Sequence, residues 1–395
     1  MTTASEGFFA SCPRGLEAPL AEEIGAAGGH DIGIVAGGVR FSGDWRACYA
    51  ANLESRLATR VLWRVGEGRY RSEDDVYRLA RRLDWPAWFD VARTLRVYVA
   101  AIKSPLKSLE FITLRIKDAV CDRFRDACGG RRPSVDTADP EVRIHAFLTA
   151  DSVTFYLDTS GEALYLRGLK HAKVQAPLKE NLAAGILRLA GWSPGMALLD
   201  PMCGSGTFLL EAAQTALAIA PGLSRPADRF ALVRLANFDA ALWRGLRAQA
   251  QARRQPPRPL ALWGRDVSAD AIARSQQNLA AAGLDGVANL ARGDILELDP
   301  PAPSGVLVAN PPYGERIGEA DELALFYPRL GDALKSRYAG WDCHFLSSDT
   351  RLAKLIGLRA DHKTPLYNGA LECRLYHFRM VSGPRRAARA DSPPS

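Results

Sequence analysis

The fold of this chain is decided by the stretch Ala197-Leu198-Leu199-Asp200-Pro201-Met202-Cys203-Gly204-Ser205-Gly206-Thr207. Its apolar start predicts a short buried strand of a parallel sheet, and the glycine-rich turn after it leads into a helix predicted for residues 208–220. A glycine loop between a strand and a helix is the context that a nucleotide-type ligand requires. Gly204 and Gly206 bring the backbone close to such a ligand because no Cβ intervenes, and the start of the helix offers free N–H groups to a carboxylate.

Acidic residues end three successive predicted strands after residue 196. Asp200 closes the first strand, Asp266 closes a second over 260–266, and Asp294 follows a third near 287–290. In an open α/β sheet these ends share one edge, where ligands bind. S-adenosylmethionine (SAM) matches the three acids, because it has an ammonium, a ribose diol and an exocyclic amine. The expected cofactor contacts are therefore Asp200, Pro201, Cys203, Gly204, Ser205, Gly206, Thr207, Asp266, Val267, Asp294, Ile295 and Asn310.

NAD is the competing ligand for a glycine loop of this kind. Its fingerprint needs a third glycine and an acid about 20 residues beyond the loop. Here the third glycine is missing and Asp266 lies 60 residues beyond Gly206. We assign this long gap to an insertion over 221–258, rich in Arg, Ala and Pro. The order of the loop, the acids and the Asn310 stretch favours SAM.

The stretch Asn310-Pro311-Pro312-Tyr313 is where we place the catalytic residues. It follows the apolar run 305–309, which predicts a further buried strand. Asn310 offers a carbonyl acceptor, the prolines fix the backbone and leave the Pro311 carbonyl as a second acceptor, and Tyr313 supplies a face for stacking. Two acceptors beside an aromatic face suit an exocyclic amine of a nucleobase, whereas an Asn-Pro turn alone would predict only a loop.

These residues predict methyl transfer without a dedicated general base. The sulfonium methyl of SAM is already activated, so hydrogen bonds from the amine to Asn310 and to the Pro311 carbonyl would stabilise the charge that develops on the nitrogen. Positioning supplies the rest. Cys203 is expected to be a small loop residue rather than a nucleophile, because transfer to an exocyclic amine needs no covalent adduct.

The composition is that of a globular protein with a basic balance. The chain has 395 residues, 47% of them hydrophobic, and a formal net charge of +7. This length predicts two or three domains. Seven Cys without a CxxC pair, and the absence of a secretory signal, predict reduced thiols and a cytoplasmic location. We expect no metal site, no membrane helix of ~20 apolar residues, and a monomer.

Residues 60–132 carry 17 Lys or Arg against 10 Asp or Glu. Within this segment, Leu109, Ile112, Ile116, Val120 and Phe124 recur every three or four residues and predict one apolar helix face. Charge runs are usually solvated helix faces. The excess of Arg over Lys nevertheless favours an RNA-binding surface here, because a guanidinium group can form bidentate hydrogen bonds to a phosphate and can stack on a base.

The motifs of the whole chain, taken together, resemble those of one methyltransferase family. The catalytic motifs Asp200–Thr207 and Asn310–Arg316 resemble class I methyltransferases that modify guanine N2 in RNA. Further matching segments are 132–136, 157–162, 176–181 and 366–372. Over about residues 6–380 the chain is similar to bacterial 23S rRNA guanine-N2 methyltransferases, in a form with one catalytic domain.

The resemblance implies a Rossmann-like class I methyltransferase domain preceded by an α+β ferredoxin-like and THUMP RNA-binding region. It also implies that Lys179, Glu180 and Asn181 lie near the cofactor. The expected division is a ferredoxin-like module (1–65), a THUMP domain (66–165), a linker (166–177), a methyltransferase domain (178–381) and a disordered tail (382–395).

Three other functions stay open at this point. A tRNA guanine-N2 methyltransferase would use the same motifs and also carry a THUMP domain. A DNA adenine-N6 methyltransferase also uses Asn-Pro-Pro-Tyr, but residues 1–165 contain no evident duplex-reading motif. An RNA-binding assembly factor would not need Asp200, Asp266 and Asn310 intact.

Overall fold

A computed structural model of the chain describes residues 5–168, 178–311 and 319–381. Its strands form two seven-stranded sheets, one in each half of the chain. Most of the predicted linker and all of the predicted tail lie outside the described residues. None of the helices in the described part of the chain is long and apolar enough to span a bilayer.

The N-terminal sheet has the strand order β2-β3-β1-β4-β7-β6-β5. Its strands are β1 (Glu6–Ser11), β2 (His30–Val35), β3 (Gly38–Gly43), β4 (Arg60–Arg69), β5 (Leu95–Ala101), β6 (Val142–Leu148) and β7 (Ser152–Asp158). The helices of this half are α1 (Glu17–Ala26), α2 (Trp45–Glu54), α3 (Glu73–Arg82), α4 (Trp85–Trp88) and α5 (Leu109–Ala127). Strand β4 pairs with β1 on one side and with β7 on the other, so the two predicted N-terminal modules share one continuous sheet.

Helix α5 confirms the predicted apolar face except at Leu109, the first residue of the helix, whose side chain is exposed. Ile112, Ile116, Val120 and Phe124 are completely buried, and Ser108 begins the helix by accepting a hydrogen bond from the Phe111 N–H. These four buried large side chains, spaced over about three and a half turns, explain why this segment is a helix packed on the sheet rather than a solvated charge run.

The C-terminal sheet has the order β10-β9-β8-β11-β12-β14-β13. Its strands are β8 (Leu198–Asp200), β9 (Leu262–Asp266), β10 (Asn289–Arg292), β11 (Gly305–Ala309), β12 (Trp341–Ser347), β13 (His362–Asn368) and β14 (Leu371–Arg379). The helices around it are α6 (Glu180–Leu189), α7 (Thr207–Ala216), α9 (Ala269–Ala281), α10 (Glu319–Arg337) and α11 (Leu352–Leu355). Strands β10, β9, β8, β11 and β12 run parallel, and β14 is antiparallel to its neighbours. The doubly wound sheet and the C-terminal hairpin are therefore confirmed.

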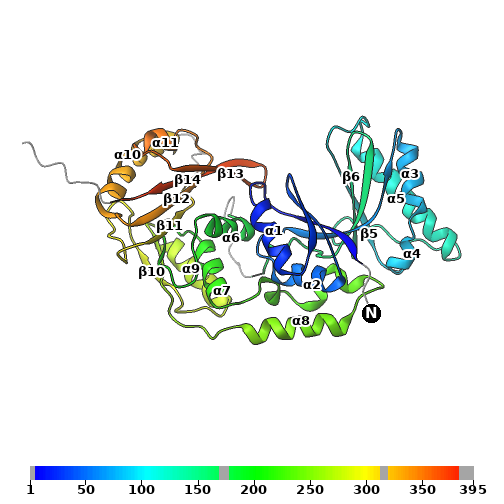
Figure 1. The fold of residues 1–395 in the computed structure, drawn as a ribbon, viewed down its shortest axis with the longest axis horizontal. Helices are drawn as coiled ribbons and strands as arrows, with labels where there is room; N and C mark the ends of the chain where they lie inside the picture. The colour runs from blue at the N-terminus through cyan, green and yellow to red at the C-terminus, as the bar shows by residue number, and fades with distance from the viewer. Residues whose placement is uncertain (1–4, 169–177, 312–318, 382–395) are drawn as a thin grey trace, which may run out of the picture.

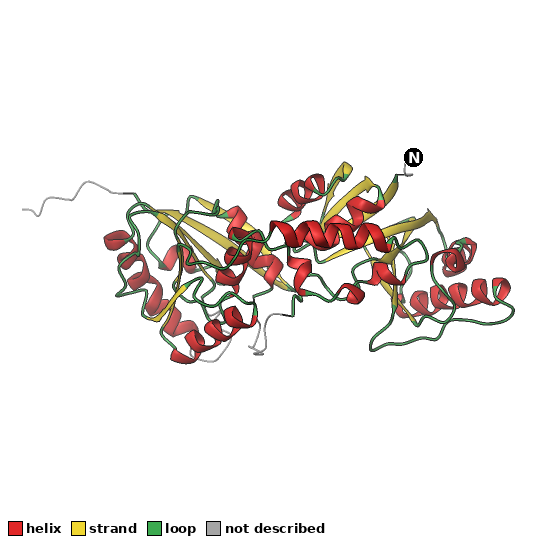
Figure 2. Ribbon diagram, turned by 90° about the horizontal axis from the view of Figure 1, so that it is seen from below, coloured by secondary structure: helices red, strands yellow, loops and turns green. Residues whose placement is uncertain are grey.

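The predicted insertion over 221–258 is a strap that crosses to the N-terminal half (Figures 1 and 2). It contains three short 3-10 helices, η1 (Pro221–Ser224), η2 (Ala227–Arg229) and η3 (Ala231–Arg234), followed by α8 (Ala240–Arg253). Buried Arg225 donates hydrogen bonds to the carbonyls of Ser160 and Ala163, at 3.1 and 2.7 Å. Trp243 of α8 packs edge-on against Tyr49 of α2. The insertion thus joins the two halves of the chain.

Candidate functional site

The glycine loop between β8 and α7 has the geometry that the sequence predicted. Gly204 and Gly206 both have positive φ, +55° and +76°, and Gly206 forms the N-cap of α7. No side chain caps this helix start, so its first N–H groups face the loop. A Cβ on Gly204 would meet no atom of the described residues within 4 Å, which leaves an open surface along the backbone for a ligand.

Helix α9 holds the loop from behind through two residues that the sequence analysis did not single out. The Ser275 hydroxyl donates to the Gly204 carbonyl at 3.0 Å, and the Asn278 amide donates to the Ser205 carbonyl at 2.9 Å. Both side chains belong to a helix that follows the next strand, and both are buried. They fix the positions of these two carbonyls and so hold the loop in its conformation.

Asp200 is the acid whose surroundings fit the cofactor most directly. Its side chain is 2% exposed, and the Met202 N–H donates to it at 3.3 Å. Within the described ranges it has no ion pair with a cation. Burial raises the pKa of its carboxyl well above the ordinary value, and the nearby Asp266 carboxylate raises it further. A ligand ammonium would supply the missing positive charge, and SAM carries one.

Asp266 lies one strand away at the same edge of the sheet. Its two carboxylate oxygens accept from the Gly204 and Ser268 N–H groups, at 3.0 and 2.9 Å. These bonds fix the orientation of the carboxylate, and each oxygen keeps a second lone pair for a hydroxyl group. The next residue, Val267, has a 59% exposed side chain that could cover a flat ring.

Asp294 follows β10, one strand further along the same edge. Its Oδ1 accepts from the Leu296 N–H at 2.9 Å, which closes a tight turn. Ile295 is 2% exposed and packs in the core, so its side chain faces away from solvent and only its main chain could reach a ligand.

Asn310 comes directly after β11, the strand between β8 and β12. The register pairs Leu307 with Leu199, so Asn310 lies two residues beyond the level of Asp200 on the adjacent strand. Asn310 is partly exposed and Pro311 is buried. The other two predicted catalytic residues, Pro312 and Tyr313, lie outside the described residues. Asp294, Asp266, Asp200 and Asn310 thus follow four neighbouring strands at one edge.

The three residues at the start of α6 that were expected near the cofactor, Lys179, Glu180 and Asn181, have different surroundings. The Asn181 side chain is buried and donates to the Thr59 hydroxyl and to the Leu57 carbonyl, at 3.0 and 3.3 Å. It therefore ties α6 to the N-terminal half. Glu180 is nearly buried in the first turn of α6, whereas Lys179 precedes the helix and lies over the Tyr165 ring.

Family models match three consecutive parts of the chain. Residues 7–62 match the RlmL ferredoxin-like domain, residues 70–158 match the THUMP domain, and residues 167–377 match the RMKL-like methyltransferase domain. The last of these covers more than half of the chain. The chain belongs to the RMKL-like methyltransferases.

Similar proteins agree with this family. The "Ribosomal RNA large subunit methyltransferase K/L" of Allochromatium vinosum is 41% identical over 94% of this chain and 51% of its own length. The "Putative RNA methyltransferase slr0064" of Synechocystis is 37% identical over 94% of this chain and 96% of its own length. The chain therefore spans about half the length of the K/L relative and nearly all of the Synechocystis protein.

A solved methyltransferase structure supports the cofactor. SMU.472, crystallised as a complex with S-adenosylhomocysteine (SAH), aligns with a TM-score of 0.86 and 29% identity over 97% of this chain and all of its own. SAH is what remains of SAM after methyl transfer. Together with the glycine loop and the unpaired buried Asp200, this establishes SAM as the cofactor of this RMKL-like methyltransferase and the class I fold as its architecture.

Cys203 is buried inside the methyltransferase loop, as its expected structural role requires. Burial raises the pKa of the Cys203 thiol to about 12, and the Asp200 carboxylate acts in the same direction. The Cys203 Sγ lies 3.6 Å from the Ser275 Oγ, whose single proton is directed mainly to the nearer Gly204 carbonyl. A thiol that stays protonated at neutral pH is a poor nucleophile.

The basic segment 60–132 lies in the half of the chain that includes the THUMP domain. Several of its cations on α5 are paired with acids, including Arg115 with Asp74 of α3 and Arg123 with Asp84. These pairs stabilise helix packing and reduce the free positive charge that the sequence suggested. Exposed cations of the segment that have no ion pair within the described residues are Arg69, Arg71, Arg82, Lys103, Lys107, Arg131 and Arg132.

Proposed function

We propose that this methyltransferase transfers a methyl group from SAM to the exocyclic N2 amine of a guanine in 23S rRNA. The observation that carries the proposal is the position of Asn310 and Pro311 at the end of β11, beside the strand that ends in Asp200. The THUMP domain and the K/L relative's name support RNA, and rRNA in particular, as the substrate.

When bound, SAM supplies an activated sulfonium methyl. The chain's own residues then have two tasks. Asp200 and the N-terminal end of α7 would bind the charged amino-acid end of the cofactor, and Asp266 would accept from its ribose. Asn310 and the Pro311 carbonyl would accept hydrogen bonds from the guanine amine, which orients its lone pair and stabilises the positive charge that develops.

Part of the basic segment is proposed to hold the RNA. The exposed cations without ion pairs lie at the ends of β4 and α5 and on α3, and they can bind phosphates without first losing a carboxylate partner. A cytoplasmic location and a monomeric state remain predictions that accompany this function.

The test is methyl transfer from labelled SAM to undermethylated 23S rRNA, bulk tRNA and DNA, followed by nucleoside analysis. We expect N2-methylguanosine in 23S rRNA only. Asn310→Ala should lower kcat roughly 100- to 1000-fold, the usual effect of removing one polar group that stabilises transition-state charge. Asn289→Ala is the matched control, because Asn289 is exposed at the opposite end of edge strand β10 and should leave kcat unchanged.

Two outcomes would replace the proposed substrate. N2-methylguanosine in tRNA would keep the chemistry and assign the runner-up function. N6-methyladenine in DNA would show that the N-terminal half does not serve RNA. Equal activity of the wild type and of Asn310→Ala would refute the role assigned to Asn310.

A further inference from the structure

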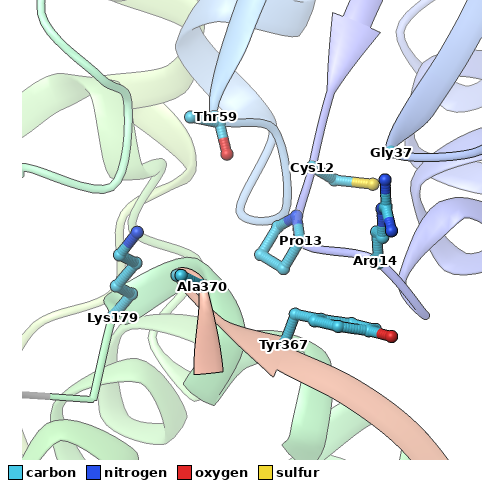
Figure 3. Close-up of a pocket in the computed structure, with 9 residues that line it drawn as sticks. Cys12, Pro13, Arg14, Gly37, Thr59, Lys179, Tyr367 and Ala370 are labelled. Carbon is cyan, nitrogen blue, oxygen red and sulfur yellow. The ribbon is translucent and has the colours of Figure 1, made fainter. Parts of the chain in front are cut away.

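A cavity of about 460 Å³ lies between the two halves of the chain (Figure 3). One wall is the loop from β1 to α1, with Cys12, Pro13 and Arg14, and the other is the β13–β14 turn, with Tyr367 and Ala370. Thr59 and Lys179 complete it, and their side chains extend toward the space from separate elements. None of the proposed SAM-binding residues other than Lys179 lines this cavity.

The wall from β1 to α1 is held rigidly against β13. Gly15 has φ +92°, and a Cβ on it would come within 2.3 Å of the Pro365 carbonyl oxygen, so only glycine allows this close approach. The Glu17 carboxylate accepts from the Gly15 and Gly37 N–H groups, each at 2.8 Å. The cavity therefore does not need to be assembled when a ligand arrives.

The lining of the cavity is positively charged and aromatic. The Arg14 guanidinium lies 5.6 Å from the centre of the Tyr367 ring, and the Lys179 ammonium lies 5.0 Å from the centre of the Tyr165 ring. Neither cation forms an ion pair with another described residue, and none of the described residues that line the cavity is acidic. Two cations without acidic partners beside a ring face suit a phosphate linked to a flat base.

The cavity lies at the same edge of the sheet as Asn310. Strand β13 is antiparallel to β14, which is antiparallel to β12, so Asn368 ends β13 at the edge where Asn310 follows β11. Three strand spacings separate β11 from β13, about 14 Å. A few nucleotides of single-stranded RNA span such a distance.

We propose that this cavity binds one nucleotide of the single-stranded RNA that flanks the methylated guanine. Arg14 contacts its phosphate, and its base stacks on Tyr367. The proposal rests on RNA being the substrate, and it makes Arg14 and Tyr367 substrate-positioning residues. An RNA strand bound here is held by both halves of the chain at once.

The full-length chain and four variants test this proposal. Tyr367→Ala should raise the Kd for a short fluorescein-labelled single-stranded RNA about 5- to 150-fold, the range for one base–aromatic stack, whereas Tyr367→Phe should stay near wild type. Arg14→Gln should weaken binding and reduce the slope of log Kd against log salt by about 0.7, the value for one phosphate on a single strand. Arg258→Gln, at the amino end of β9, removes the same charge from the opposite edge and should leave Kd nearly unchanged.

Methylation kinetics on undermethylated 23S rRNA provide the second readout. Tyr367→Ala and Arg14→Gln should raise KM for the RNA while kcat changes little, because both residues lie away from the reacting amine. Thermal unfolding and SAM affinity should match the wild type, which separates a lost contact from a damaged fold.

The outcomes separate the two proposals. If Tyr367→Ala and Arg14→Gln bind the labelled RNA and turn over 23S rRNA as the wild type does, the cavity proposal is wrong while the proposed function stands. An equal loss of RNA affinity in Arg258→Gln would also contradict the cavity proposal, because it would mean that affinity depends on the net charge of the protein and not on a contact made by Arg14. If binding depends on Arg14 and Tyr367 but no RNA is methylated, the proposed function fails and the nucleotide site remains.

Discussion

The two glycines of the SAM loop should respond differently to substitution by alanine. An L-residue in the left-handed region costs roughly 1–2 kcal/mol, and Gly204 and Gly206 both have positive φ. At Gly204 this backbone strain is the whole cost, because an added Cβ meets no atom within 4 Å. At Gly206 the Cβ would lie 3.0 Å from the Ser275 hydroxyl, which cannot turn away without losing its bond to the Gly204 carbonyl.

These geometries give separate magnitudes for stability and for binding. Gly204→Ala should cost about 1–2 kcal/mol. Gly206→Ala should cost about 1–3 kcal/mol more, the usual range for overpacking. For SAM affinity we expect the opposite order, with the larger loss in Gly204→Ala. A Cβ at Gly204 enters the open surface along which the ligand would pass, so this variant should bind SAM at least tenfold more weakly.

Thermal unfolding and calorimetric titration with SAM measure the two effects. Gly245→Ala serves as the control, because Gly245 lies in α8 with open space around it and should gain about 0.4–1 kcal/mol. The double variant Gly206→Ala/Ser275→Ala should recover only part of the overpacking loss, because the Ser275 Cβ stays 3.2 Å from the added Cβ and the hydrogen bond to the Gly204 carbonyl is lost. If Gly204→Ala binds SAM within twofold of the wild type, the ligand does not pass along that backbone and our account of the loop is wrong.

Two further predictions concern Asp200 and Arg225. The raised pKa of buried Asp200 means that the folded state holds this proton more tightly than the unfolded chain does, so stability without SAM should fall as pH rises above the ordinary carboxyl range. Asp200→Asn should weaken SAM binding and reduce the difference in unfolding temperature between pH 5 and pH 8. An unchanged pH dependence in this variant would contradict the role assigned to the buried carboxyl. Arg225→Met should destabilise the chain by about 3 kcal/mol or more, because several carbonyls lose their hydrogen-bond donor at about 1–3 kcal/mol each. Arg229→Met is the control and should have little effect, because Arg229 is exposed. Equal unfolding temperatures for the two variants would contradict the role assigned to the 221–258 insertion.

Strand ends were the part of the site that the sequence could predict. Asp200, Asp266 and Asn310 each follow an apolar run, and parallel strands place such ends at one edge whatever the loops between them do. Ser275 and Asn278 could not be predicted in the same way. They lie in the middle of an ordinary amphipathic helix, and only the packing of α9 against the loop shows what they hold.

Charge was less informative than hydrophobic spacing. The periodic apolar residues of α5, apart from Leu109, located its buried face correctly, because the 3.6-residue helical repeat places them on one side of the helix whatever packs against it. The cations Arg115 and Arg123 instead depend on acids about 40 residues away in sequence, so counting charges along 60–132 overstated the free basic surface. The cavity beside Tyr367 was also beyond the sequence, since its walls come from distant segments that meet only in the folded chain.

The continuous N-terminal sheet has a consequence for how a target would be chosen. Strand β4 is bonded along both sides, and the strap from 221 to 258 docks this sheet onto the methyltransferase domain (Figure 1). The span from the THUMP end of the molecule to the catalytic edge is therefore set by covalent and hydrogen-bonded structure. If the THUMP end binds one feature of the RNA, the molecule would act as a molecular ruler. It would select a guanine by its distance from that feature more than by the bases around it.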